Sequence, residues 1–283
     1  MGRLKKYLNQ RKAGLGKVRF FFLREHKMNH KLLVLLAGQS NMSGRGYLTQ
    51  EDITEIPGLT AIRRDFKWIP AVDPFNYDRL NMLGFVDSRD PFEEKGLTIG
   101  DRRRAGVGPG RTFGKYMKQF FPEYEIGLIP ASIGGTPIAA WLPGGKDPYS
   151  EAHPYDDSLK LAREAMKSGQ IAAVLWHQGE TDASQQTPGY KDKLKQVVMN
   201  FRKDLDLPEV PFILGELGSF LDASWPVAEY NRMIREVSEE LPHTGWVPTS
   251  DLADRGDRLH FSTESQHELG RRYWEEFRRL SAI

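Results

Sequence analysis

Cysteine is absent from the 283-residue sequence. Its absence excludes disulfide bonds, a thiolate nucleophile, and zinc or iron–sulfur sites held by thiolate ligands. Long apolar runs are absent too: no stretch is long enough to cross a bilayer, and residues 1–30 contain no apolar segment of signal-peptide length. The sequence therefore predicts a cytoplasmic protein without a membrane span.

Acidic residues are scarce at the beginning of the chain. Residues 1–30 hold nine Lys and Arg side chains and a single acid, Glu25, whereas residues 31–283 carry 31 basic and 37 acidic side chains. A tail of this composition is typically a solvated extension, and a transit peptide or a contact with an anionic surface are the alternatives. We expect a basic N-terminal extension over 1–30 and one domain over 31–283, whose mildly acidic charge indicates no nucleic-acid partner.

Nucleotide-binding motifs are also missing. The chain contains no Walker A sequence. The glycines Gly106, Gly108 and Gly110 follow the residues DRRRA instead of a strand, so their spacing is not a dinucleotide fingerprint. We expect no cofactor.

Apolar and amphipathic segments alternate along the rest of the chain. The predicted strands are 32–37, 126–131, 171–176, 211–217 and 245–249. The predicted helices are 109–120, 156–167, 190–204, 227–241 and 263–280. This alternation predicts a single-domain, three-layer α/β/α sandwich with a five-stranded parallel sheet in the flavodoxin-like order 2-1-3-4-5.

Residues 44–110 show little periodicity and many glycines and prolines. Segments of this length without regular structure are uncommon in compact domains and are often functional. The aromatic residues of this segment that we consider are Phe66, Trp68, Phe75, Tyr77 and Phe85. We expect an elaborated loop region in which about half of these rings anchor the loop and the others shape a pocket.

Ser40 directly follows the first predicted strand, within GQSNM at 38–42. Ligands of open α/β sheets bind outside the carboxyl ends of the strands, so a hydroxyl at this point is accessible for chemistry. Ser40 is a candidate nucleophile, and a serine that caps the next helix is the alternative. The sequence is not the nucleophile elbow G-x-S-x-G, because Met42 occupies the second glycine position.

The next two predicted strands also end in polar or glycine-rich sequence. SIGGT occupies 132–136, and HQGETD occupies 177–182. Glycine after a strand allows the backbone to approach a ligand and present an amide donor, and Gln178 can add a side-chain donor. Together with the Ser40 amide, these groups would form an oxyanion hole for a tetrahedral intermediate of ester hydrolysis. A simple tight turn and a surface glutamine are the alternatives.

A candidate base lies near the other end of the chain. His260 follows Asp257 by three residues and precedes the last predicted helix. A carboxylate at this spacing can accept a hydrogen bond from Nδ1–H and leave Nε2 free to take the serine proton. A local turn bond between the two residues is the alternative.

Four blocks, GQSN at 38–41, SIGGT at 132–136, WHQGE at 176–180 and DRLHF at 257–261, occur in this order. With them the chain resembles the SGNH hydrolase superfamily over residues 31–275, and more narrowly the sialate O-acetylesterase and acetylxylan esterase group, carbohydrate esterase family 6. The resemblance implies the SGNH hydrolase fold and a serine esterase that removes O-acetyl groups from carbohydrates, of acetylxylan or sialate type, through an acyl-enzyme.

The resemblance also implies roles for individual residues. It implies Ser40 as nucleophile, His260 as general base and then acid, and Asp257 as the orienting carboxylate. It implies oxyanion donation from the amides of Ser40 and Gly135, with Gly134 as the alternative, and from the Gln178 side chain.

Residues around the blocks are expected to support the site. Gln39 and Asn41 flank the candidate nucleophile, and Gln39 stands where the broader superfamily has Asp. Gln178 stands where the superfamily has Asn. Glu180 is expected to organise the Gln178 loop by hydrogen bonding, with direct support of His260 as the alternative.

Other readings of these residues lead to other functions. Metal ligation by His177, Glu180 and Asp182, as in a metal-dependent phosphoesterase, is disfavoured because all three lie at the end of one strand without a second cluster. A non-catalytic carbohydrate-binding protein on the same fold is a further alternative.

Rings and cations near the blocks are candidates for contacts with the acetylated carbohydrate. Trp141, and Trp68 or Tyr77, can stack on a sugar ring or pack into the core. The arginines Arg63, Arg64 and Arg102 to Arg104 can meet an acidic sugar or form a solvated face.

Overall fold

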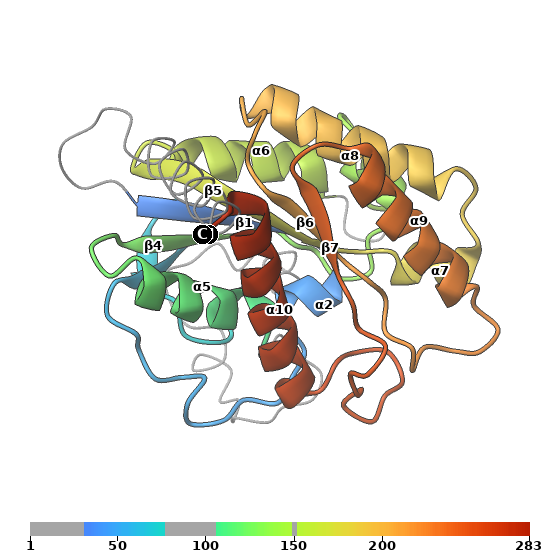
Figure 1. Cartoon of the computed structure of the whole chain (residues 1–283), viewed down its shortest axis with the longest axis horizontal. Helices are drawn as coiled ribbons and strands as arrows, with labels where there is room; N and C mark the ends of the chain where they lie inside the picture. Colours follow the sequence, from blue (N-terminus) through green and yellow to red (C-terminus); the bar gives the residue numbers. More distant parts are fainter. Residues whose placement is uncertain (1–30, 77–105, 149–151) are drawn as a thin grey trace, which may run out of the picture.

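The strand β1 (Lys31–Gly38) lies at the centre of a sheet that is covered on both faces (Figure 1). Its side chains alternate between two apolar cores: Leu33 and Leu35 enter one core, and Val34 and Leu36 enter the other. An uninterrupted apolar strand is stable here because both of its faces are buried. The computed structural model describes residues 31–76, 106–148 and 152–283.

The central part of the sheet is parallel. β1 pairs with β4 (Ile126–Pro130) on one side and with β5 (Gly169–His177) on the other. β6 (Phe212–Gly215) and β7 (Thr244–Val247) continue the sheet in parallel beyond β5. These strands lie in the order β4-β1-β5-β6-β7, so the predicted flavodoxin-like order of the five is confirmed.

The predicted size of the sheet, five parallel strands, is wrong. Over the described residues the sheet has seven strands and is mixed: β2 (Leu59–Ile62) pairs in parallel with β4, and β3 (Trp68–Pro70) pairs antiparallel with β2. Both strands come from residues 44–110, which we expected to be loop. They are four and three residues long, which is too short for a periodic pattern to reveal them.

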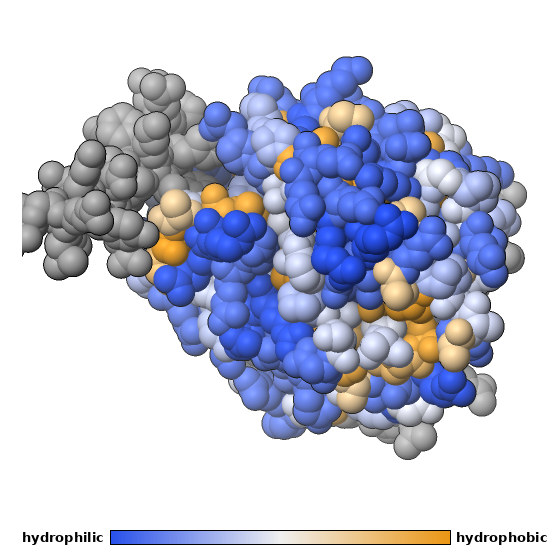
Figure 2. Space-filling model, turned by 45° about the vertical axis from the view of Figure 1, so that its right-hand side comes forward, coloured by the Kyte–Doolittle hydropathy of each residue, from blue (hydrophilic) through white to orange (hydrophobic). Residues whose placement is uncertain are grey.

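Helices form the outer layers, as expected for a three-layer sandwich (Figure 1). The helices α5 (Pro109–Phe120) and α10 (Thr263–Ser281) cover one face of the sheet, and α6 (Pro154–Ala165), α8 (Tyr190–Asp204) and α9 (Val227–Glu240) cover the other. The predicted strand and helix boundaries differ from the observed ones by at most two residues. The face seen in Figure 2 is mostly hydrophilic, with a limited apolar area toward the lower right.

In the described part of the chain, three short helices follow strands of the sheet, and the sequence did not predict them as separate elements. They are α2 (Ser40–Ser43) after β1, η1 (Ile138–Trp141) after β4, and α7 (Glu180–Gln185) after β5. Each lies next to a sequence block singled out above, so all three bear on the site.

Some predictions concern parts of the chain outside the described residues. They are the basic extension over 1–30 and the candidate side chains Tyr77, Phe85 and Arg102 to Arg104. Within the described ranges, no helix combines the length and the apolar character that crossing a membrane requires.

Candidate functional site

Three of the four sequence blocks meet at the carboxyl edge of the sheet. β4, β1 and β5 are parallel neighbours, so the loops that follow them emerge side by side. The Ile133 N–H donates to Gly38 O at 2.9 Å, and the Gln39 N–H donates to His177 O at 2.8 Å. The turn that contains Ser40 is therefore held between the other two loops.

Gly38 makes the close approach of this turn to β5 feasible. Its φ is +127°, and a Cβ atom built there would lie 2.1 Å from His177 O. Only glycine fits a backbone of this conformation at this distance. The chain turns at Gly38 so that α2 begins at Ser40, whose side chain lies at the edge of the sheet.

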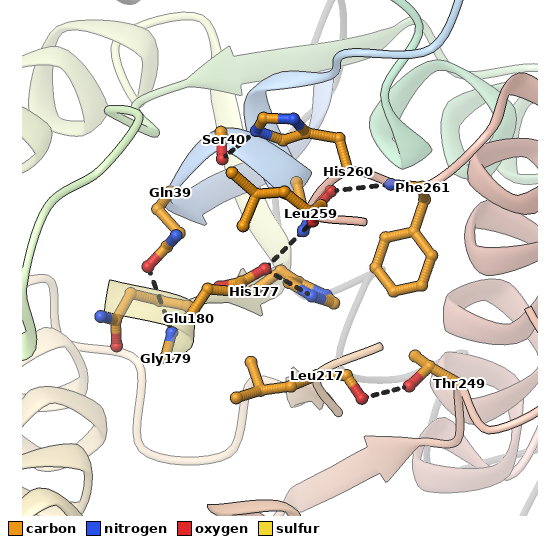
Figure 3. Close-up of polar contacts among 12 residues, drawn as sticks. Gln39, Ser40, His177, Gly179, Glu180, Leu217, Thr249, Leu259, His260 and Phe261 are labelled. Carbon is orange, nitrogen blue, oxygen red and sulfur yellow. Dashed lines mark hydrogen bonds and ion pairs between the residues drawn. The ribbon is translucent and has the colours of Figure 1, made fainter. Parts of the chain in front are cut away.

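Ser40, His260 and Asp257 lie in line at this edge. His260 Nε2 is 3.0 Å from Ser40 Oγ, and His260 Nδ1 is 2.8 Å from Asp257 Oδ2 (Figure 3 shows the first contact). The second Asp257 oxygen accepts from the backbone N–H groups of His260, at 2.8 Å, and of Leu259, at 3.0 Å. With Nδ1–H donated to the carboxylate, Nε2 is free to accept the hydroxyl proton.

The charges in this line favour an ionised carboxylate and a neutral imidazole. Partial burial alone would raise the pKa of Asp257, but hydrogen bonds from His260 and Arg255 outweigh it and hold that pKa well below its usual range. Burial lowers the pKa of His260 below its usual 6.5, and the Asp257 carboxylate offsets this only in part. His260 is thus ready to act as a base near neutral pH.

Arg255 is a residue of this site that the sequence pattern did not indicate. Its Nε donates to Asp257 Oδ2 at 2.6 Å, and its Nη1 donates to Arg45 O at 2.7 Å. It therefore fixes the carboxylate and ties the loop that carries His260 to the chain beyond α2. The signal in the sequence was an arginine two residues before the aspartate, which is too common a pattern to be selective.

The backbone N–H groups of Ser40 and of Gly135 have no acceptor among the described residues. Gly135 has φ +78° and is partly exposed, whereas Gly134 is buried. The loop that contains Gly135 lies beside the end of β1, because the Ile133 N–H donates to Gly38 O. Unpaired amides in such a place are available to a negatively charged oxygen.

The prediction that the Gln178 side chain donates a hydrogen bond to the oxyanion is wrong. Its side chain is fully buried, and Nε2 donates to Thr136 O at 3.1 Å and to Asp182 Oδ2 at 2.5 Å. Both amide hydrogens are engaged, so the group cannot donate to a ligand. Gln178 instead links the loop after β5 to the SIGGT loop after β4. The organising contact that we expected from Glu180 is made by Asp182.

Gln39 also supports the site, through hydrogen bonds to the loop after β5. Its side chain is buried, and Oε1 accepts from the Gly179 N–H at 3.3 Å (Figure 3). Oε1 also accepts from the Thr181 N–H at 3.5 Å. These N–H groups belong to the start of α7, where a helix has unpaired donors. Gln39 thus holds the loop after β5 against the Ser40 turn.

Glu180 lies under the site and faces Asn41 and His177. Glu180 Oε1 accepts from Asn41 Nδ2 at 2.5 Å. The same oxygen lies 3.5 Å from His177 Nε2 (Figure 3). All three side chains are almost fully buried. In the described part of the chain, no group of three or more histidine, aspartate or glutamate side chains is arranged as a metal site.

Of the two alternatives for Trp141, packing into the core is the one observed. Its side chain is fully buried, its Nε1 donates to Thr136 Oγ1 at 2.9 Å, and its ring packs edge to face on Trp176. An apolar core surrounds the ring because η1 turns it toward the sheet. It offers no open face to a ligand.

The described aromatic residues of segment 44–110 differ in exposure. Phe75 is buried and Trp68 is partly buried, with Lys31 Nζ 5.0 Å from its ring centre. Phe66 is exposed and lines a small pocket together with Arg64 and residues of α6. Phe75 therefore anchors the segment, whereas Phe66 is exposed to solvent.

Comparisons with known proteins show which family the chain is similar to. The family model for "Carbohydrate esterase, sialic acid-specific acetylesterase" matches residues 30–279. A protein of Arabidopsis thaliana named as a probable carbohydrate esterase is 29% identical over 254 residues, covering 84% of this chain and 86% of that protein.

Solved structures share the fold. An X-ray structure of a protein from Arabidopsis thaliana superimposes with a TM-score of 0.70 at 24% identity, covering 88% of this chain and 98% of the other. A carbohydrate acetylesterase from Xanthomonas citri superimposes with a TM-score of 0.60 at 17% identity, covering 88% of this chain and 56% of that chain. Because the family model spans nearly the whole described domain, the chain belongs to the family described as "Carbohydrate esterase, sialic acid-specific acetylesterase", a family of carboxylic ester hydrolases of the SGNH type.

Proposed function

We propose that this protein hydrolyses O-acetyl esters on carbohydrates through an acyl-enzyme, with Ser40 as nucleophile, His260 as general base and then acid, and Asp257 as the carboxylate that orients His260. The observation that carries the proposal is the line of contacts from Ser40 Oγ to His260 Nε2, at 3.0 Å, and from His260 Nδ1 to Asp257 Oδ2, at 2.8 Å.

Acylation follows from this geometry. Ser40 Oγ attacks the acetyl carbonyl carbon while its proton passes to His260 Nε2, and the imidazolium is stabilised by the Asp257 carboxylate. The negative charge that develops on the carbonyl oxygen is stabilised by the unpaired N–H groups of Ser40 and Gly135. His260 then gives its proton to the sugar oxygen, which leaves as an alcohol, and the acetyl group stays on Ser40.

Deacylation repeats the sequence with water. His260 takes a proton from the water molecule, the resulting hydroxide attacks the acetyl carbonyl, and His260 returns the proton to Ser40 Oγ as acetate leaves. Every proton is carried by one imidazole. The steps need no metal ion or organic cofactor.

The substrate that we propose is an acetylated carbohydrate, with acetylated xylan and O-acetyl sialic acids as the two types to distinguish. The family description supports the sugar as the alcohol part of the ester. Acetate release from a panel of acetylated xylan oligosaccharides and O-acetyl sialic acids would identify the preferred type.

A fluorophosphonate probe tests the role of Ser40. The wild-type protein should be labelled at Ser40 and should hydrolyse a chromogenic acetate ester. Ser40→Ala should lose both the label and turnover. Turnover retained by pure Ser40→Ala protein would overturn the proposal, and a wild-type protein that binds acetylated sugar without labelling would be a binding protein.

A further inference from the structure

Asn41 follows Ser40 in α2, and its side chain contacts the residues on both sides of His260. Asn41 Nδ2 donates to Leu259 O at 3.2 Å, and Asn41 Oδ1 accepts from the Phe261 N–H at 3.2 Å. The side-chain amide of Asn41 therefore binds the backbone on both sides of His260, the proposed base. Asn41 is itself next to Ser40, the proposed nucleophile.

Glu180 determines which way this amide faces. Its buried Oε1 accepts from Asn41 Nδ2, and a carboxylate has no hydrogen to donate. A flipped Asn41 amide would set Oδ1 against the carboxylate and Nδ2 against the Phe261 N–H. Burial alone would raise the pKa of Glu180, but the hydrogen bond from Asn41 and the nearby imidazole of His177 outweigh it and hold that pKa below its usual value. The carboxylate is therefore ionised.

His177 anchors the same arrangement from within the core. Its Nε2 lies 3.5 Å from Glu180 Oε1, and its ring packs edge to face on Phe261 with the ring centres 5.4 Å apart (Figure 3). His177 and Phe261 are fully buried, and Glu180 is nearly so. The contacts that hold the His260 loop are thus supported by His177, at the end of β5.

The other contacts of this loop act differently. Asp257 binds His260 and Leu259 within the turn, so it sets the shape of the turn and the angle of the imidazole. The bond from Arg255 to Arg45 O reaches the chain beyond α2 from the outer side. Asn41 links the loop to the helix turn of Ser40 itself, so it bears directly on the distance between hydroxyl and imidazole.

We propose that Asn41 and Glu180 are positioning residues that hold the His260 loop at the distance where Nε2 reaches the Ser40 hydroxyl. This inference rests on the proposed roles of Ser40 and His260. Neither positioning residue touches the reacting atoms, and their effect passes through the backbone of Leu259 and Phe261.

Single variants measure the effect. Asn41→Ala and Glu180→Ala should each lower kcat for an acetate ester by about 10²-fold, because a displacement of about 1 Å costs that much, with KM changed less than about threefold. Glu180→Gln should lose less than Glu180→Ala, because a carbamoyl oxygen can still accept from Asn41 Nδ2. The double variant N41A/E180A should be no slower than the worse single variant, since the two residues act through one contact.

A reversed hydrogen bond supplies a sharper test that keeps the side-chain volume. Asn41→Asp puts an oxygen where Nδ2 donated, facing both Glu180 and Leu259 O, and should lower kcat strongly. Adding Glu180→Gln to that variant supplies a donor to the new carboxylate, so part of the lost kcat should return. No recovery in N41D/E180Q would contradict the proposed contact.

Two readouts separate positioning from general damage. The acid limb of the kcat/KM pH profile should keep its midpoint in Glu180→Gln, because the effect on His260 is geometric; a shifted midpoint would mean that the Glu180 charge acts on the imidazole directly and would overturn the inference. Thr249→Val is the matched control: it removes another buried hydrogen bond, from Thr249 Oγ1 to Leu217 O (Figure 3), and should leave kcat unchanged.

The outcomes also separate this inference from the proposed function. If Ser40→Ala retains turnover, the proposed function fails. If Ser40→Ala is inactive but Asn41→Ala and Glu180→Ala keep wild-type kcat, the proposed function stands and the positioning roles fail. Variants that lose near-ultraviolet circular dichroism are set aside, and the volume-conserving N41D and E180Q pair then decides.

Discussion

The Ser40 hydroxyl lies 3.0 Å from His260 Nε2, although 220 positions separate the two residues along the chain. The contact joins the end of the central strand to the loop before the last helix. Both partners also have fixed neighbours: Gly38 forces the serine turn against β5, and Asp257 holds the imidazole from behind. The reactivity that we propose therefore depends on a distance that the whole sheet maintains.

The pH dependence of activity should reflect a depressed pKa of His260. Only the neutral imidazole accepts the Ser40 proton, so kcat/KM should rise as pH passes upward through the pKa of His260 and then reach a plateau. Burial lowers that pKa below 6.5, so the midpoint of the acid limb should lie below pH 6.5. Initial rates on a chromogenic acetate ester between about pH 4 and 8 measure it. A midpoint above 6.5 would contradict the burial of the ring.

Asp257→Asn should shift the acid limb of the kcat/KM pH profile and lower the activity on its plateau. The carboxylate raises the pKa of His260, so its removal should shift the midpoint to lower pH. The plateau of kcat should fall by about 10⁴-fold, because the orientation and tautomer of the ring are lost. Asp254→Asn is a matched control: Asp254 accepts backbone bonds in the same turn but does not contact the imidazole. A plateau unchanged in Asp257→Asn would remove this residue from the mechanism.

Arg255→Gln should shift the acid limb of the kcat/KM pH profile to higher pH, opposite to the shift expected for Asp257→Asn. The positive charge of Arg255 lowers the pKa of His260, and it also helps to hold the pKa of Asp257 down. Without it, the midpoint of kcat/KM should move to higher pH, and the plateau should fall less than in Asp257→Asn. The pH profile of the pure variant decides, and a shift to lower pH would show that the charge of Arg255 does not reach the imidazole.

Gln178→Leu should reduce stability. The substitution removes the bonds to Thr136 O and Asp182, and leaving buried polar groups unpaired costs about 1–3 kcal/mol in the free energy of unfolding. Urea unfolding followed by fluorescence measures the loss. An oxyanion donor would behave differently, with a kcat reduced by about 10²–10³-fold in a protein of unchanged stability, and that result would contradict the buried role.

Gly38→Ala should destabilise the protein much more than Gly144→Ala. Both glycines have a positive φ, +127° and +73°, so a side chain at either position strains the backbone by about 1–3 kcal/mol. At Gly38 the new Cβ would also lie 2.1 Å from a backbone oxygen of β5, whereas at Gly144 nothing lies within 4 Å. The two free energies of unfolding, compared in one urea series, isolate the cost of the contact. Equal losses in the free energy of unfolding would show that the backbone of β5 shifts to accommodate the new Cβ and would contradict the prediction.

The sequence by itself determined the features that arise from neighbouring residues. The apolar run of β1 required burial on both faces, and the alternation of segments then implied parallel neighbours in the observed order. Asp257 and His260 are three residues apart, so their contact is local and a turn brings it about. Parallel strands carry their carboxyl ends to one edge, which is why Ser40 and the SIGGT loop could be placed together before any coordinates.

Only the tertiary structure decided which partner each polar or aromatic side chain takes. An amide such as Gln178 or Asn41 both donates and accepts, so its role depends on which groups surround it, and these come from distant segments. Burial is likewise a property of the packed layers: Trp141 lies in the core because η1 turns it inward. The strands β2 and β3 are short and gain their stability by adding to the edge beside β4, an edge that exists only once the sheet has formed.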